Sequence, residues 1–270
     1  MHELSLYGSI PVGNHDHLLQ QLAGLTAMQP QAVHEIHVVF KGRQALGLEK
    51  VSGTVGGGSA GTQQQQQDLQ RLRTMLQSGV FYVQLIGSLL PRDNKRSTVT
   101  RQGSGENSIG WENQEVEWTF KFKDTPEAAK QSASTRLVSR VKFNQGDMVT
   151  FLDMFGFEYV NRYVVEGQRF YHQDTSLFLH RVRRLPAPRD NVSATDISDL
   201  PPWAKLPLLD ASGTYILQAM VEIVDGNTQE LRDRATGQLL ALRDTLKSEV
   251  TLAQPDRLAL DTRVPITRRP

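Results

Sequence analysis

Apolar and polar residues alternate along several stretches of the chain, most clearly at residues 116–122. There apolar residues, three of them aromatic, occupy every second position from Val116 to Phe122, with glutamate, threonine and lysine between them. A period of two predicts a strand with one packed face and one wet face. Alternation, or a β-rich run bounded by turn residues, predicts further strands at residues 3–10, 34–41, 80–90, 136–143 and 214–224.

The chain from Asp147 to Leu185 is predicted to fold as one unbroken unit. It begins with apolar residues at helical spacing, from Met148 to Phe155. We therefore expect a short helix that packs against the rest of the fold through one apolar face. Asp147 is placed to cap its first N–H groups, and Gly156 is placed to end it in the left-handed conformation.

Strands are predicted to complete this unit. Aromatic and β-branched residues fill positions 157–165, and the pair at 166–167, Glu-Gly, indicates a turn. Residues 168–172 then return, 173–176 turn again, and 177–183 form a third strand.

Two longer helices are also indicated. The first has a leucine stripe between Leu18 and Leu25, a cap at Asn14 or Asp16, and an end near Pro30. The second begins with a pattern like a capping box at Asn227 and Glu230, and it is expected to lie on a sheet. Its apolar positions are Leu231, Leu239, Leu242 and Leu246.

The remaining stretches are polar or irregular. We interpret residues 46–67, 91–110 and 124–135 as flexible insertions, 68–77 as a short helical turn, and 186–212 as an irregular connection. Eight or nine strands with short helices and no βαβ rhythm favour a mainly β (α+β) fold, an antiparallel sheet closed into a barrel. We expect one such domain over residues 1–270.

Two blocks of sequence resemble a known family, subunit 18 of the Mediator complex of RNA polymerase II transcription. The first block is LYGSI at Leu6–Ile10, a leucine-rich helix, and then HEIHVVFKG from His34. The second block is the unit from Asp147 to Leu185. In it a short helix is followed by Gly-Phe, a strand, Glu-Gly, an aromatic return strand and a basic final strand. The blocks cover about half of the chain and stand in the family's order.

This resemblance implies a β-barrel that works through protein–protein contacts. It implies a non-enzymatic subunit of the head module, a nuclear coregulator of RNA polymerase II transcription, with no catalytic residue, cofactor or metal. The implied partners are the related barrel of subunit 20 and a helix of subunit 8. Such partners require an apolar patch on the surface of the isolated chain.

The amino-acid composition excludes several kinds of site and function. Of 270 residues, 39% are hydrophobic, enough for a core, and 30 lysines and arginines balance 29 acids to a net charge of +1. A general electrostatic footprint for nucleic acid is therefore missing. The absence of cysteine excludes disulfides, zinc–thiolate sites and cysteine nucleophiles. No signal-like or membrane-length apolar segment stands out, so we expect a soluble intracellular protein.

Two glycine motifs are formal matches without the context they need. Gly56 to Gly61 fits G-x-G-x-x-G, but a glutamine run follows where a helix and an acidic residue are required. Ser59 fits G-x-S-x-G, yet a flexible loop cannot strain a nucleophile. We interpret both as accidents of composition.

Histidines raise the question of a metal. His15 and His17 are close in sequence, as are His34 and His37, but the spacing of the second pair sends its members to opposite strand faces. Without cysteine, a shared ligand set is not expected.

A local basic cluster ends the central unit, at His180, Arg181, Arg183 and Arg184. Interleaved Phe178 allows a single-stranded nucleic-acid interpretation. Because no wider basic field supports it, we favour a polar face that meets an acidic partner or the barrel interior.

The unit also resembles the triphosphate-tunnel hydrolases, whose first strand carries E-x-E-x-K for a metal and phosphates. The corresponding residues here are Glu3, Ser5 and Tyr7, which lack the second carboxylate and the lysine. We therefore expect a lumen without the charges needed to act on phosphate. A tunnel-type metal-dependent triphosphate hydrolase is the alternative function.

Overall fold

The computed structural model describes residues 1–43, 81–90, 115–128, 131–143, 147–188, 192–197 and 200–264. The segments predicted as insertions at 46–67 and 91–110, and the helical turn at 68–77, lie outside the described residues. So do the glycine stretch and its Ser59.

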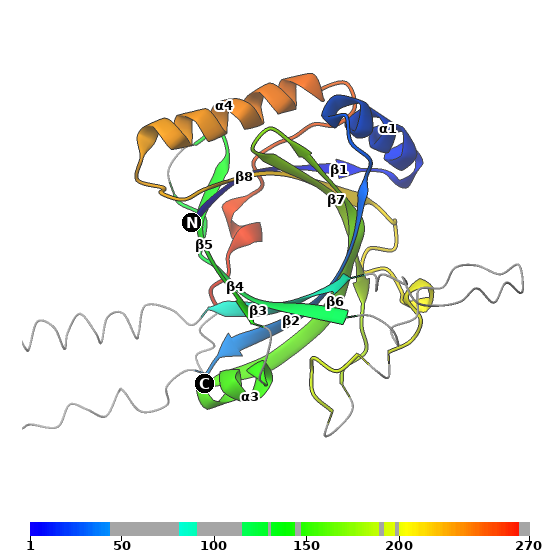
Figure 1. Ribbon diagram of the computed structural model, residues 1–270, viewed down its shortest axis with the longest axis vertical. Coiled ribbons are helices and arrows are strands. Elements are labelled where there is room, and N and C mark those ends of the chain that lie inside the picture. The colour runs from blue at the N-terminus through cyan, green and yellow to red at the C-terminus, as the bar shows by residue number, and fades with distance from the viewer. Residues whose placement is uncertain are drawn as a thin grey trace, which may run out of the picture.

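Eight antiparallel strands in the described part of the chain close into a barrel (Figure 1). Their order around the wall is β1-β5-β4-β3-β2-β6-β7-β8, and β1 closes the sheet by pairing with both β5 and β8. The strands are β1 His2–Ile10, β2 Gln31–Gly42, β3 Tyr82–Leu90, β4 Glu115–Lys123, β5 Ser134–Phe143, β6 Phe157–His172, β7 Thr175–Arg184 and β8 Tyr215–Ile223. Closure pairs each strand on both sides, and it confirms the predicted fold class.

Helices lie outside this barrel. α1 (His15–Thr26) and α4 (Gln229–Thr245) cover one side of the wall, and α3 (Met148–Met154) lies on the opposite side (Figure 1). Short 3₁₀ turns occur at η1 (Val12–Asn14), η4 (Trp203–Lys205) and η5 (Arg257–Leu260).

The hydrophobic core lies between the wall and these outer segments. On β1, Leu4 and Leu6 are buried among apolar residues of β7, β8 and α4, including Leu239. A second cluster joins β2, β3 and β6 to α3 and the η4 segment. The alternate positions of the strands face inward and are largely polar, so the barrel has an apolar outer surface and a polar lumen.

The predicted turn at Glu166-Gly167 is wrong, because β6 runs through it without a break. A Cβ at Gly167 would lie 2.1 Å from the carbonyl oxygen of Leu179 on β7. Gly167 therefore permits a close approach of two strand backbones. An isolated glycine within a strand often marks such an approach and not a turn. The unit after α3 is one long hairpin, β6 and β7, that turns at residues 173–174.

Several boundaries also differ from the sequence prediction. β5 begins at Ser134, so the end of the predicted insertion at 124–135 belongs to a strand. Thr228, and not Asn227, holds the N-cap position of α4. Its side chain makes no capping hydrogen bond, because its hydroxyl donates to the Asp225 carboxylate, which also accepts from the Asn227 N–H. The predicted ends of α3 are confirmed: Asp147 accepts from two helix N–H groups, and Gly156 has φ +80°.

The chain after α4 crosses one mouth of the barrel. Ala253 bridges to Tyr7 on β1, and Arg263 bridges to Phe81 beside β3. Between these points residues 259–262 line the lumen, and Figure 1 shows η5 against the ring of strands. We refer to residues 253–263 as the C-terminal crossing.

The close approach at Gly167 leads to a first prediction. Gly167→Ala is expected to destabilise the protein by about 1–3 kcal/mol, because the added methyl group forces the β6 and β7 backbones apart. Gly24→Ala is the matched control. Gly24 lies within α1 with nothing within 4 Å of its Cβ position, so alanine should stabilise by about 0.5–1 kcal/mol. Chemical denaturation measures both, and equal effects would contradict this role of Gly167.

Candidate functional site

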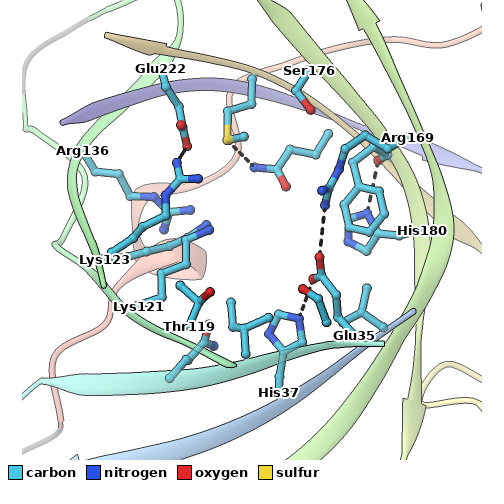
Figure 2. Close-up of a pocket in the computed structure, with 18 of the residues that line it drawn as sticks. Glu35, His37, Thr119, Lys121, Lys123, Arg136, Arg169, Ser176, His180 and Glu222 are labelled. Carbon is cyan, nitrogen blue, oxygen red and sulfur yellow. Dashed lines mark hydrogen bonds and ion pairs between the residues drawn. The ribbon is translucent and has the colours of Figure 1, made fainter. Parts of the chain in front are cut away.

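The lumen encloses a cavity of about 940 Å³ that is lined by inward side chains of several strands. Figure 2 shows Lys121, Lys123 and Arg136 pointing into it from one side, and Glu35, His37 and Arg169 from the other. The strand pattern explains the arrangement, because inward polar positions alternate with outward ones that are apolar on β4 and mixed on β5.

One carboxylate organises the cations on the β4–β5 side. Glu3 of β1 is fully buried, and its carboxylate accepts hydrogen bonds from Arg136 at 3.0 and 2.7 Å and lies 3.3 Å from the Lys123 ammonium. Burial opposes ionisation of Glu3, but Lys123 and Arg136 outweigh it and lower its pKa to about 2. Glu3 is therefore ionised throughout the physiological range.

The opposite side of the lumen is balanced. Glu35 pairs with His37 at 3.0 Å and with Arg169 at 3.2 Å. Burial of Glu35 raises its pKa, but the His37 hydrogen bond and Arg169 outweigh burial and lower it to about 2. Burial lowers the pKa of His180 to about 4, so this histidine is neutral at pH 7.

The three tunnel-motif positions, Glu3, Ser5 and Tyr7, all face inward. Glu3 holds Arg136, Ser5 is fully buried, and the Tyr7 hydroxyl accepts from the Gln218 amide at 3.1 Å. The first strand therefore lacks the second carboxylate of the tunnel motif, because Ser5 occupies its position.

The lumen carries many charged side chains that the comparison with the tunnel motif does not assign to it. β4 contributes Lys121 and Lys123, and β5 contributes Arg136, Arg140 and Lys142. Their signal was present in the sequence as the polar positions of two alternating strands. The reason is physical: the strand faces predicted only to be wet are, in this barrel, the faces that line the lumen.

The histidines do not converge. His34 packs edge-on against Trp203 outside the wall while His37 faces the lumen, which confirms that they lie on opposite strand faces. His15 stacks on Tyr215, and His17 pairs with Glu249 at 2.9 Å. Across the described ranges, no three histidines or acids are close enough together to form a metal site.

The basic cluster of β7 is divided between two faces. His180 faces the lumen, whereas Arg181 and Arg183 face outward and both contact Glu166 of β6, at 2.6 and 2.8 Å. Glu166 also accepts from the Trp203 indole. The arginines thus meet an acid of their own chain, and this weakens the nucleic-acid interpretation.

An apolar patch is exposed on the outer side of α3, and it confirms the expectation of such a patch. Phe151 is 49% exposed, Met154 79% and Phe155 67%, although Leu152 of the same helix is buried against the wall. The two phenylalanine rings lie 4.5 Å apart between centroids. We refer to these three residues as the α3 patch.

These features define a class: a closed eight-stranded antiparallel barrel in the described residues, with a charged lumen, external helices and an exposed apolar patch. None of the helices in the described ranges has the length and hydrophobicity to span a membrane.

Comparison with known proteins identifies the family. The family model described as Med18 protein matches residues 2–263, and the chain belongs to this family. Relatives named Mediator of RNA polymerase II transcription subunit 18 are 39% identical in Aspergillus oryzae and 42% identical in Aspergillus fumigatus. Each alignment covers 97% of this chain and 99% of the relative.

A solved structure shares the fold. A chain of the Schizosaccharomyces pombe Mediator head module aligns with a TM-score of 0.60 and 17% identity, over 94% of this chain and 99% of that one. At this identity the likeness shows the common barrel alone.

Proposed function

We propose that this chain is a non-enzymatic subunit of the Mediator coactivator complex, acting in the nucleus on regulated RNA polymerase II transcription. The observation that carries the proposal is the family match over residues 2–263, together with relatives named as Mediator subunit 18 over nearly their whole length. We further propose that its partners are the related barrel of subunit 20 and a helix of subunit 8. No direct sequence-specific contact with nucleic acid is part of this proposal.

The α3 patch supports a role in assembly. Exposed aromatic and methionine side chains are enriched where proteins meet, and here Phe151 and Met154 of α3 lie beside Phe155, the C-cap residue of the helix. Helix α3 is capped by Asp147 and anchored through Leu152, so the patch is presented on a fixed element.

The experiment is recovery of the tagged full-length chain from nuclear extract of its source cells, followed by quantitative mass spectrometry. Mediator subunits, with subunits 8 and 20 among them, should be recovered in near-stoichiometric amounts. Recovery of the chain without Mediator subunits would overturn the proposal.

A double variant tests the patch. Met154→Asp with Phe155→Asp should reduce recovery of partners by at least about tenfold, because each side chain lost at the centre of an interface is typically costly. The thermal midpoint of the isolated chain should not fall, since both side chains are exposed. Val224→Asp, at an 82% exposed site on another part of the surface, is the control. Equal losses from both variants would contradict a specific role of the α3 patch.

The tunnel-type hydrolase is the enzymatic alternative. Its metal needs two carboxylates on the first strand, and the one present, Glu3, is already held by Arg136 and Lys123. Purified protein should release no phosphate from tripolyphosphate in Mg²⁺ or Mn²⁺. Metal-dependent turnover would favour the alternative.

A further inference from the structure

Three basic side chains on the β4–β5 side of the lumen surround one carboxylate, that of Glu3 (Figure 2). Arg136 makes the short contacts to it, at 2.7 and 3.0 Å. The Lys123 ammonium is farther away, 3.4 Å from one oxygen and 3.3 Å from the other, whereas a charge-assisted hydrogen bond is usually about 2.8 Å long. Lys121 forms no hydrogen bond or ion pair with any described residue. Lys123 is therefore held loosely, between two other cations.

Neighbouring acids do not compensate this cluster, because they are engaged elsewhere. Glu222 pairs with Arg140, and Glu117 pairs with Lys142 at 2.8 Å. Glu35 is held on the opposite side of the lumen by its own basic partners. When all three basic groups around Glu3 are protonated, two positive charges are in excess there, although the chain as a whole is nearly neutral.

This crowding of cations favours the uncharged form of one of them. Burial, followed by the charge of Lys121, lowers the pKa of Lys123 to about 7, despite its contact with Glu3. Most of the Lys123 side chain is therefore a neutral amine at pH 8, with a free electron pair. A lysine that is withdrawn from bulk water beside another cation is the arrangement that activates an amine as a nucleophile.

The surroundings of Lys123 suit one class of electrophile, a small neutral molecule whose product is an anion. The Lys123 side chain is 21% exposed and lines the cavity of about 940 Å³, so a small molecule can reach it. An acyl group would leave a neutral amide, and Lys121 would remain without an anion. Carbon dioxide instead converts an amine into a carbamate, which carries a negative charge. Two carboxylate groups would then face the two remaining cations, and the excess of positive charge would vanish.

We propose that Lys123 is a site of reversible modification by carbon dioxide, at which its amine forms a carbamate held by Lys121 and Arg136. The Nζ electron pair attacks the carbon atom of carbon dioxide, so that an N–C bond forms and one C–O π bond breaks. The nitrogen then releases one proton to water or buffer, and no oxidant or reductant is needed. The modification is independent of the proposed role in Mediator, because it takes place inside the barrel and not on its outer surface.

Carbon-13 NMR of the full chain in ¹³C-labelled bicarbonate at pH 8 tests this proposal. We expect a carbamate resonance from the lumen in addition to that of the Met1 α-amine, which serves as an internal reference. Alkylation of the carbamate with a trialkyloxonium salt, followed by peptide mass spectrometry, should assign it to Lys123. Lys123→Arg keeps the positive charge but has no amine that adds carbon dioxide, so the resonance should disappear. Lys205→Gln removes an exposed lysine of η4 and should leave it unchanged.

A second variant tests how the carbamate is held. Lys121→Gln should lower the carbamate fraction by about tenfold at a fixed concentration of carbon dioxide, because one charged contact to the carbamate is lost. This variant should fold, since Lys121 has no acidic partner to leave behind. In bicarbonate the thermal midpoint of the parent chain should also rise above its value in sodium chloride of equal ionic strength, whereas that of Lys123→Arg should not.

The direction of the pH dependence provides a further readout. Lys123 is surrounded by Glu3 of β1, Lys121 of its own strand and Arg136 of β5, with Asp261 of the C-terminal crossing also lining the lumen. Because Glu3 stays ionised and the reaction releases a proton, the carbamate fraction should rise from pH 6 to pH 8 at constant dissolved carbon dioxide. Failure to trap a carbamate at Lys123, or a resonance or thermal shift that survives in Lys123→Arg, would overturn the proposal. The surviving thermal shift would indicate simple binding of bicarbonate.

Discussion

Glu3→Gln is expected to lower the free energy of unfolding by about 3–5 kcal/mol, although it changes one atom of a side chain and keeps its shape. In the native protein the Glu3 carboxylate accepts two hydrogen bonds from Arg136, whose side chain is 5% exposed. The same carboxylate partly neutralises the positive charge of Lys123. A neutral amide leaves the buried guanidinium without a counter-charge. Breaking a buried pair costs far more than the pair itself contributes.

Denaturant unfolding of matched variants separates this cause from a general effect of the substitution. Glu117→Gln alters a second lumen carboxylate, but its partner Lys142 is 69% exposed, so the expected loss is below about 1 kcal/mol. Combining Glu3→Gln with Arg136→Met removes both charges and should recover much of the stability. If Glu3→Gln proves as mild as Glu117→Gln, the buried pair is not what stabilises this part of the barrel.

The strands of this fold were predictable because each of them has one apolar face and one polar face. The leucines of β1 alternate with Glu3 and Ser5, and the aromatic residues of β4 alternate with Glu117 and Lys121, so the period of two was visible in both. Helix α3 was equally clear, since Asp147 and Gly156 mark its two ends. The sequence was sufficient to predict an element wherever the residues that specify the element lie within it.

The break wrongly predicted within β6 shows where local chemistry fails. Glu166-Gly167 is a common turn pair, and nothing nearby in the sequence reveals that β7 passes close to Gly167. That contact joins residues of two strands, and only the folded sheet brings them together. The same holds for Glu166, whose three partners come from β7 and the η4 segment.

The convergence of Lys121, Lys123 and Arg136 in the lumen could not be predicted for a related reason. Periodicity assigns Lys121 and Arg136 to polar faces, but it does not say whether a polar face meets bulk solvent or a lumen. This depends on which side of the closed sheet the helices cover. Here α1, α3 and α4 all pack outside, so the polar faces of β4 and β5 are enclosed together (Figure 1).

The enclosed lysines should give the protein an unusual dependence on pH. Lys123 has a pKa of about 7 in the folded chain, against an ordinary value of 10.5, with burial as the first cause. Between these two values the unfolded chain binds more protons than the folded one, so stability should rise with pH. The gain should reach about 4 kcal/mol by pH 10, and the lowered pKa of Lys121 acts in the same direction.

Lys123→Met provides the decisive comparison. This variant removes the group that must lose its proton, so it should be more stable than the parent chain at pH 7 and should gain much less between pH 7 and pH 10. Above that range the raised pKa values of Tyr7 and Tyr163, caused first by burial, reverse the slope, because the folded chain then retains protons that the unfolded chain releases. Urea midpoints measured at intervals of one pH unit should therefore rise and then fall in the parent chain. A flat parent profile from pH 7 to pH 10 would mean that Lys123 keeps its ordinary charge inside the barrel.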